Sequence, residues 1–230
     1  MKICGLNKTT LLDYPGIVAA TIFLGGCNFC CPFCHNRDLV LHSGEIPEYS
    51  EEEIFTFLKK RKNVLEGVCI TGGEPTLYEE LPDFIKKIKD LGYKVKLDTN
   101  GSNPEMVKRL LDGKQIDYVA MDIKAPVYKY DEVCGASVDM EKIQQSVELI
   151  KTGEISYEFR TTVVREFHTK EDILEIGKWL NGAEYYYLQS YQDTENNIRQ
   201  GFSAMEKEEL FTLQKELQKY VKKVKVRGVE

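Results

Sequence analysis

The chain of 230 residues is long enough for one domain with a sizeable core and too short for two large ones. Its 42% hydrophobic and 30% charged residues are ordinary for a globular protein and exclude a disordered chain. A net charge of −6 gives no overall positive field for nucleic acid or anionic lipid, and the longest apolar run, Ile17–Leu24, cannot span a bilayer. The first residues carry no apolar signal segment, so we expect a cytoplasmic protein. From the charge and the short apolar run we expect it to bind neither nucleic acid nor membranes.

Short runs rich in β-branched residues alternate with longer amphipathic segments. The predicted strands are Val18–Phe23, Gly67–Thr71, Tyr93–Asp98, Asp117–Asp122, Tyr157–Val164 and Glu184–Ser190. The predicted helices are Ser50–Lys62, Tyr78–Leu91, Pro104–Asp112, Asp139–Lys151, Lys170–Leu180 and Ser203–Tyr220, and a basic strand follows at Val221–Arg227. Capping patterns support three of the helix starts, at Ser50 with Glu53, at Asn103-Pro104 and at Ser203 with Glu206.

Strands that alternate with helices predict right-handed β-α-β units and a parallel sheet. Six units are too few for a closed eight-stranded barrel, which leaves an open partial (β/α)6 barrel or a doubly wound sheet; the positions of the motifs favour the barrel. We expect one domain over residues 1–230, with its core at about residues 15–190 and a terminal helix and strand within residues 203–230. The least regular stretch, Ala125–Val138, is predicted to be a loop at the functional face.

Seven cysteines are the unusual feature of the composition, and four of them lie between Cys27 and Cys34. Read as C-x3-C-x2-C, Cys27, Cys31 and Cys34 offer three thiolates from one loop after the first predicted strand. Three cysteines can hold an iron–sulfur cluster that keeps one iron open for a further ligand. The alternatives are a zinc site built from two C-x2-C pairs, which has no spacer between its pairs here, and four buried structural cysteines. Cys4, Cys69 and Cys134 are too scattered to predict a second cluster.

Polar motifs follow the next predicted strands at the same end of the sheet. They are Thr71-Gly72-Gly73-Glu74-Pro75, Leu97-Asp98-Thr99-Asn100-Gly101, Met121-Asp122-Ile123-Lys124, and Arg160 with Thr162. Strand alternation puts Asp122 and Lys124 on one face. An acid and a base inside a barrel mouth are costly to bury without a ligand or mutual pairing, whereas the plain alternative is a surface ion pair. Gly72 and Gly73 allow a ligand to approach the backbone closely, although paired glycines more often mark a simple turn.

The segment Lys8-Thr9-Thr10-Leu11-Leu12-Asp13-Tyr14-Pro15-Gly16, the cysteine loop and the strand-end motifs together resemble the glycyl-radical-enzyme activases of the radical S-adenosylmethionine (SAM) superfamily. Among them the chain is most similar to anaerobic ribonucleoside-triphosphate reductase activating proteins. The resemblance implies a 4Fe–4S cluster on Cys27, Cys31 and Cys34, which leaves Cys30 as the spare thiol. It also implies that Gly72, Gly73 and Glu74 receive the SAM amino group.

Further roles follow from the same resemblance. Lys124 suits the SAM carboxylate, Arg160 lies near SAM, and Asp98, Thr99 and Asp122 hold a monovalent cation or bind the ribose. From its position alone, directly after the last cysteine of the loop, His35 is a candidate donor to the cluster. His42 and His168 carry no spacing that suggests a ligand and are interpreted as surface or satisfied residues, and the role of Gln189 is open.

The implied activity is reductive cleavage of SAM at the cluster and formation of a glycyl radical on a partner enzyme. The expected partners are an anaerobic ribonucleotide reductase and a flavodoxin or ferredoxin-type electron donor. Two rival functions use the same loop. One is a radical SAM enzyme that acts on another glycyl radical enzyme, a peptide or a small molecule, and the other is a zinc-stabilised binding module without catalysis.

Overall fold

The structure is a computed structural model that describes residues 1–229. Its centre is one sheet with the strand order β1-β2-β3-β4-β5-β6-β7-β8, in which β1 is antiparallel to β2 and all other neighbours are parallel. The strands are β1 (Ile3–Thr10), β2 (Ala19–Leu24), β3 (Gly67–Gly72), β4 (Lys94–Thr99), β5 (Tyr118–Asp122), β6 (Ser156–Val163), β7 (Tyr185–Ser190) and β8 (Lys223–Arg227).

Eight α-helices and three short 3-10 helices join the strands. The α-helices are α1 (Arg37–Leu41), α2 (Glu51–Arg61), α3 (Leu81–Asp90), α4 (Pro104–Asp112), α5 (Tyr130–Cys134), α6 (Met140–Thr152), α7 (Lys170–Trp179) and α8 (Lys207–Leu217). The 3-10 helices are η1 (Ser43–Glu45), η2 (Pro75–Leu77) and η3 (Val127–Lys129). Among residues 1–229, no helix combines the length and the apolar composition needed to cross a bilayer.

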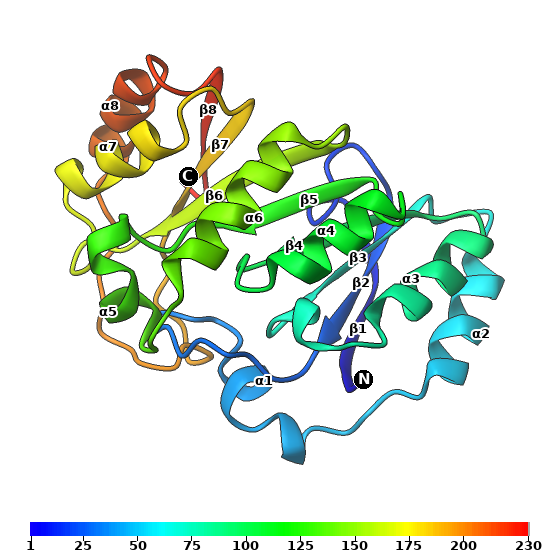
Figure 1. Cartoon of the computed structure of the whole chain (residues 1–230). Helices are drawn as coiled ribbons and strands as arrows, with labels where there is room; N and C mark the ends of the chain where they lie inside the picture. Colours follow the sequence, from blue (N-terminus) through cyan, green and yellow to red (C-terminus); the bar gives the residue numbers. More distant parts are fainter. Residues whose placement is uncertain (230) are drawn as a thin grey trace.

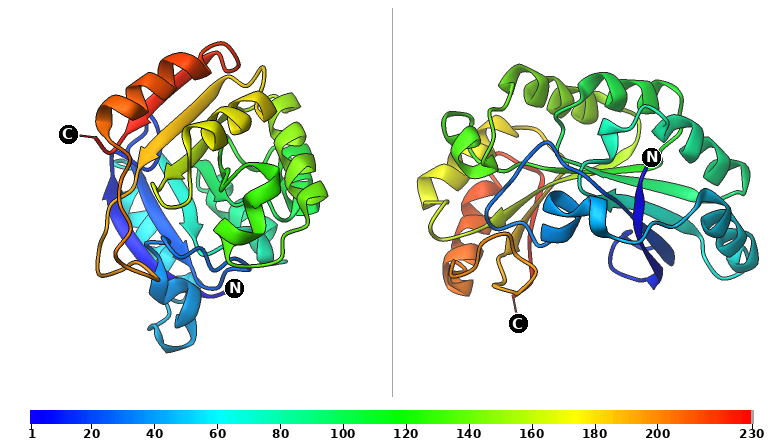
Figure 2. Two further views of the ribbon diagram at one scale, coloured as in Figure 1. Left: turned by 90° about the vertical axis from the view of Figure 1, so that its left-hand side faces the viewer. Right: turned by 90° about the horizontal axis from the view of Figure 1, so that it is seen from below.

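The sheet is curved and open, with β1 and β8 as its two edges (Figure 1). Helices α3, α4 and α6 lie on the outer side of the sheet, and the segment around α1 lies on the opposite side (Figure 2). The predicted open partial barrel is therefore confirmed. It contains seven parallel strands, because the expected terminal strand joins the sheet as β8.

Strand alternation divides each central strand into two faces. The side chains that pack toward the helices are apolar and fully buried, as in Ile22, Ile70, Leu97, Val119 and Phe159. The residues between them are largely polar. Thr21, Cys69 and Lys96 are neighbours in register across β2, β3 and β4, and all three are buried. The inside of the open barrel is thus polar, whereas its wall is an apolar core.

One strand and two α-helices were not predicted, and neither were the three 3-10 helices. The edge strand β1 carries glycine and polar residues without regular alternation, and α1 and α5 each have only five residues, which is too short for a helical period to be recognised. The stretch predicted as an irregular loop at Ala125–Val138 contains η3 and α5, although it does lie at the functional face.

The predicted caps at Ser50 and Asn103 are confirmed, since each side chain accepts a hydrogen bond from the first turn of its helix. The predicted start of the last helix at Ser203 is wrong. The Ser203 backbone N–H donates to the Glu166 carboxylate, and Ala204 forms a β-bridge with Val164. Helix α8 therefore begins at Lys207, after Glu206, whose backbone N–H donates to the Glu209 carboxylate at 3.2 Å.

Candidate active site

A pocket opens where β2, β3, β4, β5 and β6 end. The predicted residues that line it are Cys27, Cys31, Cys34, Gly72, Gly73, Glu74, Asp98, Thr99, Asp122, Lys124 and Arg160. Thr71, Asn100, His35 and Thr162 line it as well. Residues from five separate parts of the chain thus meet at one mouth, because the carboxyl ends of parallel strands lie at the same edge of the sheet.

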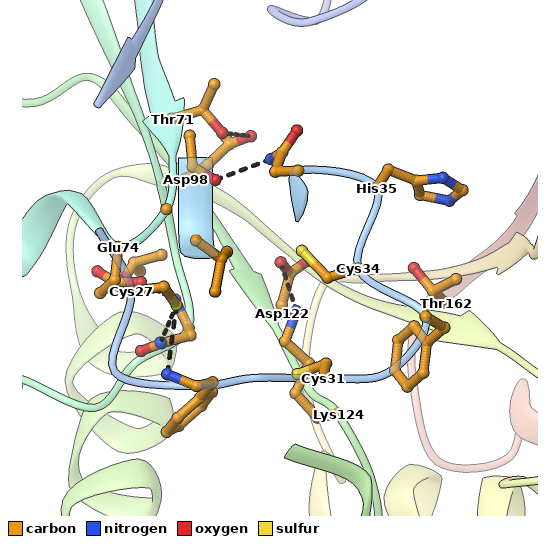
Figure 3. A pocket seen from close by; sticks show the side chains of 18 of the residues that line it. Cys27, Cys31, Cys34, His35, Thr71, Glu74, Asp98, Asp122, Lys124 and Thr162 are labelled. Carbon is orange, nitrogen blue, oxygen red and sulfur yellow. Dashed lines mark hydrogen bonds and ion pairs between the residues drawn. The ribbon is translucent and has the colours of Figure 1, made fainter. Parts of the chain in front are cut away.

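The cysteine loop runs from the end of β2 to α1 and crosses the mouth of the barrel (Figure 3). Of the cysteines in this loop, Cys27, Cys31 and Cys34 line the pocket, and Cys30 does not. Backbone hydrogen bonds fix the loop at several points, including Gly26 N–H to Leu39 O at 2.7 Å and Cys30 N–H to Cys134 O at 2.8 Å.

The thiols of this loop differ in acidity. A hydrogen bond from the Cys134 thiol lowers the pKa of Cys31 below its ordinary value, against the opposing effect of burial and with help from the nearby Lys124 ammonium. Burial raises the pKa of Cys27 to about 12 and also raises the pKa of Cys34. Because thiolates are the metal-binding form, Cys31 is the thiol best prepared to bind metal.

Cys134 was not linked to this site by the sequence, because its neighbours in the chain carry no metal-binding pattern. In the structure, Cys134 lies at the end of α5 and its thiol contacts Cys31.

Among residues 1–229, no three His, Cys, Asp or Glu side chains lie close enough together to hold a single metal ion. The alternative of a zinc site would need four of the clustered cysteines around one ion. A cubic iron–sulfur cluster has a different requirement, since each thiolate binds a separate iron and the sulfur atoms stand farther apart.

Gly72 and Gly73, which line the pocket, also have a structural role. Gly72 has a φ of +120°, and a Cβ on Gly73 would lie 1.8 Å from the carbonyl oxygen of Gly26. The two glycines therefore let the loop after β3 pack directly on the backbone of the cysteine loop. Hydrogen bonds join the two loops, from Gly73 N–H to Leu24 O and from Glu74 N–H to Gly26 O, both at 2.8 Å.

Glu74 is almost completely buried, and protein groups already bind its carboxylate. Oε1 accepts from Thr76 N–H at 3.0 Å, from the Thr76 hydroxyl and from the Thr99 hydroxyl at 2.7 Å. Oε2 accepts one hydrogen bond, from Asn100 N–H at 2.6 Å. Burial raises the pKa of Glu74, and these donors oppose that rise. One acceptor position on Oε2 is left for a further donor from the pocket.

Asn100 also links the motifs, since its side-chain amide donates to Asn28 Oδ1 at 2.9 Å and lies 3.9 Å from the Cys27 sulfur. The sequence indicated only a turn at Asn100-Gly101.

Five charged side chains form a connected network beneath the mouth. Arg160 Nη2 lies 3.0 Å from Asp98 Oδ2, Arg160 Nε donates to Asp122 Oδ1, and Lys124 Nζ lies 3.0 Å from Asp122 Oδ2. Lys96 donates to Asp98 Oδ1. Asp122 and Lys124 are thus part of an internal network and are not a simple surface pair (Figure 3).

The network sets the ionisation of its members. Burial would raise the pKa of Asp98, but Arg160 and Lys96 hold it below its ordinary value. Burial acts likewise on Asp122, and Arg160 and Lys124 hold its pKa far below the ordinary range. Both carboxyl groups are therefore ionised at neutral pH.

Lys96 was missed in the sequence, although strand alternation places it on the face of Asp98, two residues further along β4.

The other predicted residues lie around this centre. His35 lines the pocket and stacks on Tyr191 with ring centroids 5.9 Å apart. His168 is buried and satisfied, and His42 is exposed, as predicted.

Comparison with known proteins assigns the family. The sequence profile of the radical SAM superfamily matches residues 21–180, which include the cysteine loop and the four strand-end motifs. The chain belongs to the radical SAM superfamily. Membership implies an enzyme that uses a 4Fe–4S cluster and SAM, and the three cysteines that line the pocket fit such a cluster.

Two relatives indicate which class of radical SAM enzyme this protein resembles. A Methanocaldococcus jannaschii protein that is named for glycyl-radical enzyme activation is 32% identical to it, over 99% of this chain and 96% of that protein. The pyruvate formate-lyase-activating enzyme of Clostridium pasteurianum is 33% identical over 54% of this chain and 52% of its own length.

Solved structures show the same fold. SuiB of Streptococcus suis bound to SAM matches with a TM-score of 0.70 and 16% identity, over 91% of this chain and 52% of that one. The chain spans about half the length of that protein. The structure of native anSMEcpe with bound AdoMet matches with a TM-score of 0.58 and 18% identity, over 85% of this chain and 58% of that one.

Proposed function

We propose that this radical SAM protein is the activase of an anaerobic ribonucleoside-triphosphate reductase and generates the glycyl radical on that partner. The observation that carries the proposal is the meeting of the three pocket cysteines with the strand-end motifs at one open mouth. The near full-length similarity to a protein named for glycyl-radical enzyme activation supports the class of partner. The motif resemblance of residues 8–16 and of the cysteine loop supports the choice of the reductase.

In this proposal Cys27, Cys31 and Cys34 hold the 4Fe–4S cluster. When bound, the cluster supplies the electron for reductive cleavage of SAM and thus the hydrogen-atom abstraction that forms the glycyl radical. A flavodoxin or a ferredoxin-type protein provides that electron.

The residues around the cysteines bind and orient SAM. The free acceptor position on Glu74 receives the ammonium group, while Gly72 and Gly73 keep Glu74 close to the cysteine loop. Lys124 and Arg160 provide positive charge for the SAM carboxylate, since both already lie at the pocket wall. Asp98, Thr99 and Asp122 fix these groups by hydrogen bonds and ion pairs.

The partner's glycine loop completes the wall of the mouth. An open barrel admits a polypeptide loop from the side, and closure by that loop keeps water away from the reaction.

The test uses the anaerobically reconstituted and reduced protein with SAM and the purified reductase of the same organism. Electron paramagnetic resonance should show a glycyl radical signal on the reductase, and the signal should be absent with Cys31→Ala or with the radical glycine of the reductase replaced by alanine. A signal only with another glycyl radical enzyme would contradict the choice of partner. SAM cleavage that proceeds without any protein partner and modifies a small molecule or peptide would favour the rival function.

A further inference from the structure

The resemblance to the glycyl-radical-enzyme activases implies a monovalent cation at Asp98, Thr99 and Asp122, and the structure tests whether the two carboxylates fit one. Asp98 Oδ1 accepts from Lys96, and Asp98 Oδ2 accepts from Arg160 at 3.0 Å and from the Thr71 hydroxyl at 3.3 Å. Asp122 Oδ1 accepts from Arg160, and Asp122 Oδ2 accepts from Lys124 at 3.0 Å. All four carboxylate oxygens thus face a cationic side chain, so this set does not fit an additional cation.

The charges of the network lead to the same result. Lys96, Lys124 and Arg160 provide three positive charges against the two carboxylates of Asp98 and Asp122. One positive charge is therefore in excess, which is what one bound carboxylate needs for neutrality. A dissolved cation in the same place would leave a second excess charge in a buried site, and uncompensated buried charge is costly.

Lys96 is the member of the network that provides a positive charge from inside the open barrel. Its side chain is only 2% exposed, and its ammonium group lies beside Asp98 and 3.8 Å from the Cys69 sulfur, inside the open barrel. A lysine is rarely buried to this extent unless it is paired. Lys96 does not line the pocket, so it acts on SAM through Asp98 and not by direct contact.

We propose that Lys96 is a built-in substitute for the monovalent cation, so that this protein binds SAM without a dissolved alkali-metal ion. Lys96 is then a positioning residue. It neutralises the Asp98 carboxylate from outside the pocket, so that the positive charge of Arg160 and Lys124 is available for the SAM carboxylate. The inference rests on the proposed SAM site and adds the source of its positive charge.

The test measures the dissociation constant of SAM for the anaerobically reconstituted, unreduced protein by equilibrium dialysis, so that no turnover is involved. The salts are choline, sodium and potassium chloride at equal ionic strength, about 0.1 M. We expect the native protein to bind SAM equally in all three salts, within about twofold, because Lys96 already supplies the positive charge. Choline is the reference cation, since it is too large to enter the network.

The variant Lys96→Met removes the built-in charge. We expect its affinity for SAM in choline chloride to fall by about tenfold or more and to recover when sodium or potassium is added. The thermal midpoint of this variant should rise with sodium or potassium but not with choline. The matched control is Lys94→Met, at an exposed position of the same strand, and it should behave as the native protein does.

Four results would overturn the inference. For the native protein, they are a need for sodium or potassium to bind SAM and a failure to bind SAM in any salt. For Lys96→Met, they are native affinity in choline chloride and a loss of affinity that neither sodium nor potassium restores. Only the failure of the native protein to bind SAM in any salt would also contradict the proposed function. If Lys96→Met does not fold, the native protein in the three salts decides the question.

Discussion

The backbone N–H of Cys30 donates a hydrogen bond to the carbonyl oxygen of Cys134 at 2.8 Å, and this bond attaches the cysteine loop to the end of α5. The next residue, Gly135, has a φ of +61°, and a Cβ there would lie 2.5 Å from the Cys30 carbonyl oxygen. Cys30, which does not line the pocket, thus fixes the loop through its backbone, while Cys27, Cys31 and Cys34 line the pocket.

The first prediction concerns Gly135→Ala. The new methyl group must push the cysteine loop away from α5, so we expect a clear loss of iron per chain after reconstitution. The matched control is Gly182→Ala, since Gly182 also has a positive φ, of +84°, but has no atom within 4 Å of a Cβ. The control should lose about 1 kcal/mol of the free energy of unfolding from backbone strain and should bind iron normally. Equal iron content in both variants would contradict this account of the loop.

The second prediction separates the two adjacent cysteines. Cys31→Ala should abolish SAM cleavage and reduce the iron and sulfide content sharply, because one of three ligands is lost. Cys30→Ala should keep a native cluster spectrum, because Cys30 does not line the pocket. Iron and sulfide analysis with the visible absorption spectrum checks both variants. The ligand assignment is wrong if Cys30→Ala is the variant that loses the cluster.

The third prediction concerns the buried charges. Arg160→Met removes the donor that joins Asp98 to Asp122, and both carboxylates stay partly buried. We expect the free energy of unfolding to fall by about 3 kcal/mol, at the lower end of the loss that follows removal of one partner of a buried ion pair. Arg165→Met, which removes a partly exposed arginine just beyond the same strand, should have a much smaller effect. Urea unfolding of the two variants makes the comparison, and similar losses in both would show that the network adds little stability.

The fourth prediction is a pH dependence set by His168. Its Nδ1 accepts from the Val164 N–H at 3.0 Å, so Nε2 carries the proton and donates to the Lys124 carbonyl oxygen at 2.8 Å. Burial lowers the pKa of His168 below its ordinary value of 6.5, and these backbone contacts only partly oppose that shift. The unfolded chain therefore binds a proton more readily than the folded one below about pH 6.5, and stability should fall as the pH decreases from there through the folded pKa.

The variant His168→Gln isolates this effect, since glutamine keeps a donor and an acceptor but does not titrate. Its free energy of unfolding should depend less on pH between about 6.5 and 5 than that of the native protein. His42→Gln, at an exposed histidine, should leave the native pH dependence intact. The role of His168 is refuted if His168→Gln and the native protein lose stability in parallel over this range.

Much of the site could be predicted because its residues follow strand ends. Once β2 to β6 are assigned, the parallel sheet brings Cys27, Glu74, Asp98, Asp122 and Arg160 to one edge without any knowledge of their contacts. Strand alternation also placed Asp122 beside Lys124 correctly.

The parts that could not be predicted depend on contacts between distant segments. Cys134 meets Cys31 only because α5 folds under the cysteine loop, and a five-residue helix leaves no period in the sequence. Ser203 is a good capping residue, but its backbone is taken by Glu166, so α8 starts later. Lys96 was given no role from the sequence, because its pairing with Asp98 becomes evident only in the structure.

The most direct measurement of the central claim follows a hydrogen atom. The reductase is labelled with glycine that carries deuterium at its α-carbon, and the 5′-deoxyadenosine formed by the reduced, reconstituted protein is analysed by mass spectrometry. Our account predicts 5′-deoxyadenosine that has gained one deuterium, in step with the glycyl radical signal. A failure to form 5′-deoxyadenosine from SAM, or its formation without any deuterium from the reductase, would contradict the account.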